Sequence, residues 1–100
     1  MKTIKGVFEF EWDKGNIGKN LKHGVRDQES EEVFLDEQRF IFRDKLHSAG
    51  EERFRIIGKT KIGKLLFVVF TIRDKKVRVI SARKINRKEV HLYEKKVSIT

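Results

Sequence analysis

One histidine and four arginines of this 100-residue sequence have side chains suited to chemistry on a phosphate ester: His23, Arg53, Arg73, Arg83 and Arg87. Histidine transfers protons near neutral pH, and an arginine guanidinium binds two phosphate oxygens at once. Cleavage of RNA without a metal ion uses the ribose 2′-hydroxyl as nucleophile. The protein then has to remove that proton, protonate the leaving oxygen and neutralise charge on the phosphate.

The sequence lacks the residues that several other classes of chemistry require. The chain has no cysteine, which excludes disulfides, zinc–thiolate sites, iron–sulfur clusters and thiol nucleophiles. His23, His47 and His91 are scattered, and the carboxylates show neither Asp-x-Asp nor His-Glu-x-x-His spacing. The glycines at residues 15–18 lack the spacing of a nucleotide-binding loop. We therefore expect neither a metal ion nor a cofactor.

The candidate residues also have ordinary structural interpretations. His23 is equally suited to ending a helix, where a cation meets the helix dipole favourably. Arg53 and Arg73 are equally suited to pairing with acids across strands. Taken singly, these residues are weak indications of a site.

The same holds for the polar residues near the C-terminus. Ser81 fits the N-cap of a last helix, with Arg83 on its solvated surface. Tyr93 falls on an apolar stripe, as core residues do, and Glu89 beside it is placed to hold an arginine.

The net charge of +9 is unevenly distributed. Residues 1–50 contain 9 basic and 10 acidic side chains, whereas residues 51–100 contain 15 basic and 5 acidic ones. Such asymmetry favours a basic face for a polyanion over a surface that is merely rich in charge. Lys22, Arg73, Ser81 and Arg87 are the further residues that we expect to bind RNA.

Apolar periodicity predicts an α+β fold with an antiparallel sheet of four to five strands. The expected strands alternate or are apolar throughout, and cover residues 7–12, 40–42, 53–60, 65–72 and 77–81. Two short N-terminal helices are expected. The first is capped by Asp13, covers about residues 14–23 and is closed by Gly24, and the second is capped by Asp27 and runs to residue 34 or 35. A C-terminal helix is expected from residue 82 to about 96. Residues 43–50 are expected to form an exposed loop.

Length and hydropathy predict one domain over residues 1–100. The longest apolar stretch, residues 65–72, is far shorter than the roughly 20 residues that span a bilayer. The first residues lack the apolar region of a signal peptide. We therefore expect a cytoplasmic protein that does not associate with a membrane.

A series of motifs occurs in a fixed order along the chain. Its first half contains Phe-Glu-Trp-Asp at residues 10–13, Lys-His-Gly-Val at 22–25, Glu-Glu-Val-Phe at 31–34 and Glu-Glu-Arg-Phe at 51–54. Ile-Gly-Lys-Thr at 57–60, Leu-Leu-Phe-Val-Val-Phe-Thr at 65–71, Ile-Ser-Ala-Arg-Lys at 80–84 and Arg-Lys-Glu at 87–89, with Tyr93, follow. This ordered set resembles the BrnT family of type II toxins from about residue 7 to residue 94.

The resemblance implies a RelE-like fold and a metal-independent endoribonuclease toxin that cleaves RNA and inhibits translation. It implies a BrnA-like ribbon-helix-helix antitoxin, with which a 2:2 or larger complex binds operator DNA. The family's recurring polar residues fall on His23, Arg53, Ser81, Arg83, Glu89 and Tyr93. Of these, Arg53 and Arg83 are expected to clamp phosphate, and His23 to transfer a proton.

Two other classes of function remain open from the residues themselves. A non-catalytic RNA-binding module would use the same arginines only to hold phosphate, and its binding would weaken with salt. A protein-interaction domain would dock an acidic partner on its basic face. RNA cleavage distinguishes the enzyme from both.

Overall fold

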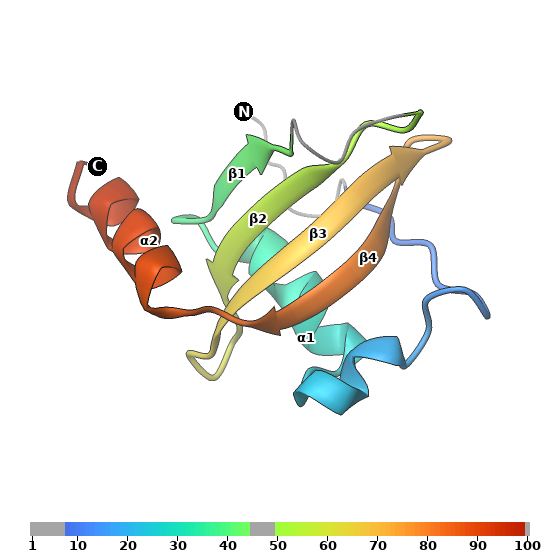
Figure 1. Ribbon diagram of the computed structural model, residues 1–100, viewed down its shortest axis with the longest axis horizontal. Helices are drawn as coiled ribbons and strands as arrows, with labels where there is room; N and C mark the ends of the chain where they lie inside the picture. The colour runs from blue at the N-terminus through green and yellow to red at the C-terminus, as the bar shows by residue number, and fades with distance from the viewer. Residues whose placement is uncertain (1–7, 45–49, 100) are drawn as a thin grey trace.

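Four antiparallel strands form the centre of the molecule (Figure 1). The computed structural model describes residues 8–44 and 50–99. Its strands are β1 (Phe40–Arg43), β2 (Phe54–Lys59), β3 (Leu65–Arg73) and β4 (Lys76–Lys84), and their spatial order follows their order in the chain. The α+β class and the antiparallel sheet expected from the sequence are confirmed. The two inner strands are β2 and β3, and β3 has apolar residues on both faces.

One face of the sheet, here called the covered face, carries the larger core. It includes Ile56, Leu66, Val68 and Phe70 from β2 and β3. The short elements η1 (Lys19–His23), α1 (Asp27–Glu32) and η2 (Val33–Leu35) lie on this side, and Val33 and Phe34 are fully buried there. A side chain at Gly58 would place its Cβ 2.8 Å from the carbonyl oxygen of Val33. Glycine therefore allows η2 to pack directly on β2.

The opposite face, here called the arginine face, carries Arg55, Phe67 and Arg83. Its smaller core joins Ile57 and Phe67 to Tyr93 of helix α2 (Arg87–Ile99). Figure 1 shows α2 to one side of the sheet, beyond the end of β4, with β3 and most of β4 not covered by it. The arginine face is thus covered only in part.

The N-terminal segment closes the outer edge of β4. The amide of Glu11 donates to the carbonyl of Val77, and the amide of Val77 donates to the carbonyl of Glu9. Asn16 donates to the carbonyl of Val79 and Asn20 accepts from the amide of Ala82. These bonds satisfy backbone groups along an edge that would otherwise be open to pairing with another chain.

This arrangement corrects the strand expected over residues 7–12. Only Phe10 forms a bridge, parallel to Val77, and residue 7 lies outside the described residues. Phe8, Phe10 and Trp12 nevertheless share one side of this segment, because all three pack against the covered-face core.

The helix expected over residues 14–23 is also wrong. Residues 14–18 form turns, and only η1 is helical. Gly18 has a left-handed φ of 66°, which separates the turns from η1. Gly24 ends η1 with a φ of 76°, as predicted. The second helix begins one residue earlier than proposed, because Arg26, not Asp27, is its N-cap, and the Arg26 amide donates to Glu29.

The boundary between the last strand and the last helix lies later in the chain than expected. Strand β4 continues to Lys84, and α2 begins at Arg87 instead of residue 82. The register between β3 and β4 shifts after Val69, so that Val69 faces Ser81 whereas Phe70 faces Val79. Ile80 is the extra residue of this β-bulge, and it moves the side chains after it to the other face. Ala82 consequently lies in the covered-face core and Arg83 on the arginine face.

The expected exposed loop over residues 43–50 is wrong at its beginning. Arg43 is the last residue of β1, and Asp44 is buried, with its amide donating to the Arg53 carbonyl. Residues 45–49 lie outside the described residues. Among the helices that are described, none has the length and apolar character needed to cross a membrane.

Candidate active site

Two arginines from different strands lie over the ring of Phe67. The guanidinium carbon of Arg83 in β4 is 4.3 Å from the ring centroid, and that of Arg55 in β2 is 5.4 Å away. Arg83 is directly opposite Phe67 in the β3–β4 register, and β2 flanks β3 on its other side. Central strand β3 therefore supplies an aromatic surface on which both cations are held.

Arg83 is held by a two-pronged ion pair with Glu89 of α2. The two nitrogens of its guanidinium are 2.9 and 2.7 Å from the two carboxylate oxygens of Glu89. The amide of Asn86 donates to Glu89 over 2.8 Å, and the Glu89 amide donates back to the Asn86 side chain over 3.0 Å. This reciprocal cap begins α2 and fixes Glu89 in place beneath Arg83.

Opposing influences act on the Glu89 carboxylate, whose side chain is only 12% exposed. Burial raises the pKa of Glu89, but the hydrogen bonds from Arg83 and the Asn86 amide, with the charge of Arg55, lower the pKa by more. The net shift is downward, so Glu89 is ionised at neutral pH. In return, the hydrogen bond with Glu89 raises the pKa of Arg83.

Arg55 is a residue that the sequence analysis missed. Its Nε lies 3.2 Å from Oδ2 of buried Asp44, and its guanidinium also lies 5.9 Å from the ring of Phe42. The signal was present, because strand alternation places Arg55 on the same face as Arg53 and Ile57. Choosing between the two arginines needed the β2–β3 register, which puts Arg55 opposite Val69.

Two further predicted residues lie near this pair. Ser81 is exposed on β4 two residues before Arg83, on the same face. The predicted N-cap role of Ser81 is wrong, because Asn86 has that position. Arg87 is exposed in the first turn of α2, which places it next to the Asn86–Glu89 cap.

The other predicted arginines lie elsewhere. Arg53 precedes β2, and its carbonyl accepts from the Asp44 amide. Arg73 ends β3 and forms an exposed ion pair with Glu51, with Nε 2.8 Å from Oε2. Arg73 lies six positions after Phe67 along β3, or roughly 20 Å away.

Lys22 and His23 are exposed in η1, the element that borders β4. Among the contacts of the described residues, none joins either side chain to Arg83 or Glu89. The structure thus brings together Arg83 and Glu89 from the predicted set and adds Arg55.

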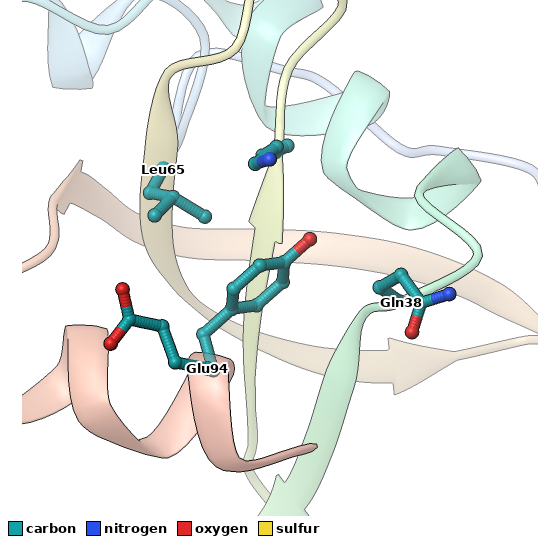
Figure 2. A pocket seen from close by; sticks show the side chains of 5 residues that line it. Gln38, Leu65 and Glu94 are labelled. Carbon is teal, nitrogen blue, oxygen red and sulfur yellow. The ribbon is translucent and has the colours of Figure 1, made fainter. Parts of the chain in front are cut away.

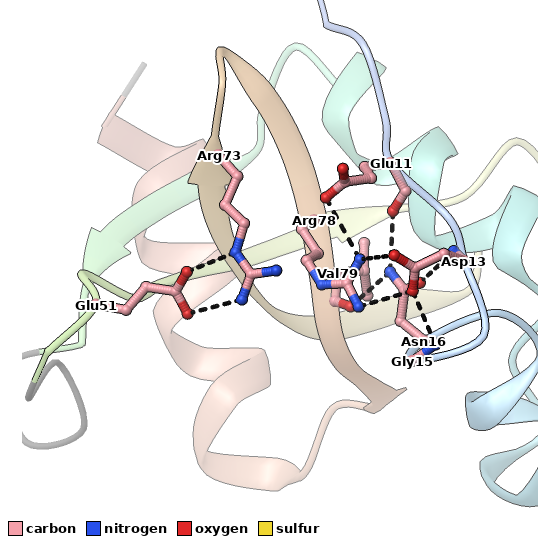
Figure 3. Close-up of polar contacts among 8 residues, drawn as sticks. All are labelled: Glu11, Asp13, Gly15, Asn16, Glu51, Arg73, Arg78 and Val79. Atoms are coloured by element: carbon pink, nitrogen blue, oxygen red, sulfur yellow. Dashed lines mark hydrogen bonds and ion pairs between the residues drawn. The ribbon is translucent and has the colours of Figure 1, made fainter.

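A second two-pronged arginine pair lies on β4 near the opposite end of the strand (Figure 3). Both terminal nitrogens of Arg78 lie 2.9 Å from carboxylate oxygens of Asp13, and one also lies 3.4 Å from Glu11. The hydrogen bond from Arg78 lowers the pKa of Asp13. This pair fastens the N-terminal segment to β4.

The hydroxyl of Tyr93 has a partner other than Arg83. This hydroxyl donates to Oδ2 of Asp36 over 2.7 Å, and burial followed by that hydrogen bond raises the Tyr93 pKa well above its usual range. The ring borders a cavity of about 260 Å³ between α2 and the end of β2 (Figure 2). The lining residues are Gln38, Lys59, Leu65, Tyr93 and Glu94.

Metal-ligating side chains do not gather anywhere within residues 8–44 and 50–99. No group of three or more histidine, cysteine, aspartate or glutamate residues in those ranges is placed to hold an ion. Cofactor-binding residues were not expected from the sequence, and the arrangement around Arg83 consists of two cations, two carboxylates and an aromatic ring.

Comparison with known proteins identifies the family. A comparison with curated proteins finds no match. The family model described as "Ribonuclease toxin, BrnT, of type II toxin-antitoxin system" matches residues 12–89, more than three quarters of the chain. The matched segment includes all four strands, Arg55, Arg83 and Glu89. The chain therefore belongs to the BrnT family of ribonuclease toxins of type II toxin–antitoxin systems.

Proposed function

We propose that this toxin cleaves RNA on the arginine face, without a metal ion, by attack of the ribose 2′-hydroxyl on the adjacent phosphate. The observation that carries the proposal is the buried Glu89 carboxylate held by Arg83 above Phe67. An arginine fork matches phosphate oxygens, and a nearby carboxylate can accept a proton. Both groups are fixed by neighbouring elements before substrate arrives.

The first step exchanges the partner of Arg83. An incoming phosphate competes with Glu89 for the guanidinium of Arg83, whose side chain remains 42% exposed. Once Arg83 binds phosphate, Glu89 loses the hydrogen bond that lowers its pKa, while burial continues to raise the pKa. Substrate binding therefore makes Glu89 a better base at the point where one is needed.

The chemical step then follows. Glu89 takes the proton of the 2′-hydroxyl, the 2′-oxygen bonds to phosphorus, and the bond from phosphorus to the 5′-oxygen breaks. Arg83 and Arg55 stabilise the charge that grows on the phosphate oxygens. The products are a 2′,3′-cyclic phosphate and a 5′-hydroxyl, whose proton comes from a second donor.

His23 is our candidate for that donor, with Arg53 as an additional phosphate clamp and Tyr93 as a further participant. Lys22, Arg73, Ser81 and Arg87 are proposed to bind the RNA on either side of the cleaved bond. No described contact joins His23 to Arg83, so its role requires RNA to run from the arginine face past β4 to η1.

The family relationship implies an RNA substrate and an antitoxin partner. We propose that the protein acts in the cytoplasm, that cleavage stops translation, and that the antitoxin is a BrnA-like ribbon-helix-helix protein. Carboxylates of the antitoxin would cover the arginine face in place of phosphate. A 2:2 or larger complex would bind operator DNA through the antitoxin.

RNA digestion in EDTA tests the proposed chemistry. The wild-type protein is expected to release fragments with 2′,3′-cyclic phosphate ends, identified by mass spectrometry. Glu89→Gln, which keeps the size of the side chain, is expected to bind RNA but to cleave it slowly. Salt-sensitive binding by the wild type without any cleavage, with or without ribosomes, would contradict the proposal and favour a binding module.

A further inference from the structure

The cavity beside Tyr93 lies on the same side of the sheet as the proposed cleavage site. Tyr93 packs with Phe67 and Ile57, and Phe67 is the residue beneath Arg83. Glu89 and Tyr93 are four residues apart in α2, so they share one helix face about one turn, or ~5.4 Å, apart. The cavity therefore adjoins the residues that hold Arg83.

The size and walls of the cavity suit a single flat ring system. Its volume of about 260 Å³ is below the ~300–1,000 Å³ of sites for larger organic ligands. Leu65 and the Tyr93 ring provide apolar walls, and single-stranded RNA is usually recognised through bases that leave the stack and contact aromatic side chains. Figure 2 shows Glu94 and Gln38 at opposite sides of the cavity.

The charged lining residues distinguish among the four bases. A carboxylate accepts hydrogen bonds, and the two oxygens of Glu94 are best matched by two adjacent N–H groups. Guanine alone presents such a pair, at N1 and the 2-amino group. Lys59, whose ammonium lies 5.9 Å from the centroid of the Tyr93 ring, can donate to the guanine O6 or N7 acceptors. Adenine would present its amino group where guanine has O6.

We propose that this cavity is a guanine subsite that selects where RNA is cleaved. The subsite rests on the proposed function, since it reads the nucleotide next to the phosphate held by Arg83. Glu94 is the specificity-determining residue, Lys59 supports the same base, and Tyr93 forms the wall that joins the subsite to α2. Neither Glu94 nor Lys59 takes part in the bond-breaking step.

Nucleotide binding tests the subsite independently of cleavage. The wild-type protein is titrated with guanosine, inosine and adenosine 5′-monophosphates while backbone amide shifts are followed by NMR. Guanosine monophosphate is expected to bind about tenfold more tightly than inosine monophosphate, which lacks the 2-amino group, with shifts around Lys59 and Glu94. Equal affinities for the three nucleotides, or shifts confined to other regions, would overturn the proposal.

Cleavage mapping supplies the second measurement. On an RNA that contains all four bases in varied contexts, the wild type is expected to cut next to guanine, and Glu94→Gln is expected to lose about tenfold of that preference. Asp74→Asn removes the same charge from the distant β3–β4 turn and should leave the preference unchanged. An unaltered cleavage pattern in Glu94→Gln would overturn the subsite. An inactive wild type that still prefers guanosine monophosphate would overturn only the proposed function.

Discussion

Arg78 and Arg83 lie five residues apart on β4, and each forms a two-pronged ion pair with one carboxylate, yet their surroundings differ. The partner of Arg78 is Asp13, whose side chain is 55% exposed, whereas the partner of Arg83 is Glu89, whose side chain is 12% exposed. Asp13 belongs to a segment that the pair fastens, and Glu89 is already fixed by the cap of α2.

The difference shows how the same contact can serve structure in one place and chemistry in another. Removing Arg78 from Asp13 would leave a solvated carboxylate that still accepts a hydrogen bond from the Gly15 amide. Removing Arg83 from Glu89 would leave a buried carboxylate whose pKa rises. Only the second pair can therefore produce a base when a phosphate displaces the carboxylate. The following variants separate the two pairs.

The largest effect is expected for Arg83→Ala, which removes the proposed phosphate clamp. Cleavage of RNA should fall by about 10²–10³-fold, because a preorganised donor to the transition state is lost. Arg78→Ala should keep the wild-type rate per folded molecule. Initial rates, normalised to the folded fraction from circular dichroism, provide the comparison.

Because Arg83→Ala leaves Glu89 without its partner, a folding defect must be separated from a catalytic one. Arg83→Lys retains the charge but not the planar fork, and we expect it to fold and to cleave much more slowly than wild type. A folded Arg83→Lys variant with full activity would show that two-pronged binding is not used.

The next largest effect is expected for Glu89→Gln. The rate should fall by about 10²-fold, within the usual contribution of a general base. The wild-type rate should rise with pH until Glu89 is fully ionised in the RNA complex, and the variant should lack that rise. Identical pH–rate profiles for the two proteins would remove Glu89 from the proton-transfer step.

Arg78→Ala should affect stability more than activity, with a thermal midpoint lower by roughly a few degrees. Because the folded state lowers the pKa of Asp13, the stability from this pair is present above the ordinary aspartate range near ~3.9 and is lost as pH falls. The difference in midpoint between wild type and variant should thus shrink in acid. A difference that stays constant across that range would argue against the ion pair as its source.

The smallest effect is expected for Arg73→Ala. Its ion pair with Glu51 is solvent-exposed at both side chains, and such pairs contribute little to stability. The melting curve should match that of wild type, and RNA binding at low salt should weaken only slightly. A loss of cleavage comparable to that of Arg83→Ala would show that RNA contacts extend to the far end of β3.

Sequence patterns predicted most of the sheet because β1, β2 and β3 follow simple alternation or are apolar throughout. The β-bulge at Ile80 is the feature that they missed. Val77 and Val79 point into the covered-face core, and after the bulge Ala82 does so instead. Local periodicity therefore suggested a helix from residue 82, although Asn86 and Glu89 have the spacing of a capping box three residues apart.

The candidate site was predicted only in part for a related reason. Arg83 and Glu89 are close in sequence, so their association could be proposed from the chain alone. Arg55 reaches Phe67 from a strand on the other side of β3, and only the register of three strands brings it there. His23 lies in η1, which follows the turns around Gly18. Because those turns replace the expected helix, sequence spacing alone could not locate His23 relative to the sheet.

The pKa of Glu89, with and without a bound substrate analogue, tests the central claim most directly. Carboxyl ¹³C NMR can follow its titration in the free protein and in a complex with a 2′-deoxy-substituted RNA, which cannot be cleaved by 2′-hydroxyl attack. The account predicts a pKa below the ordinary glutamate value in the free protein and a higher pKa in the complex. A pKa that stays low when the analogue is bound would contradict the exchange of Arg83 from Glu89 to phosphate.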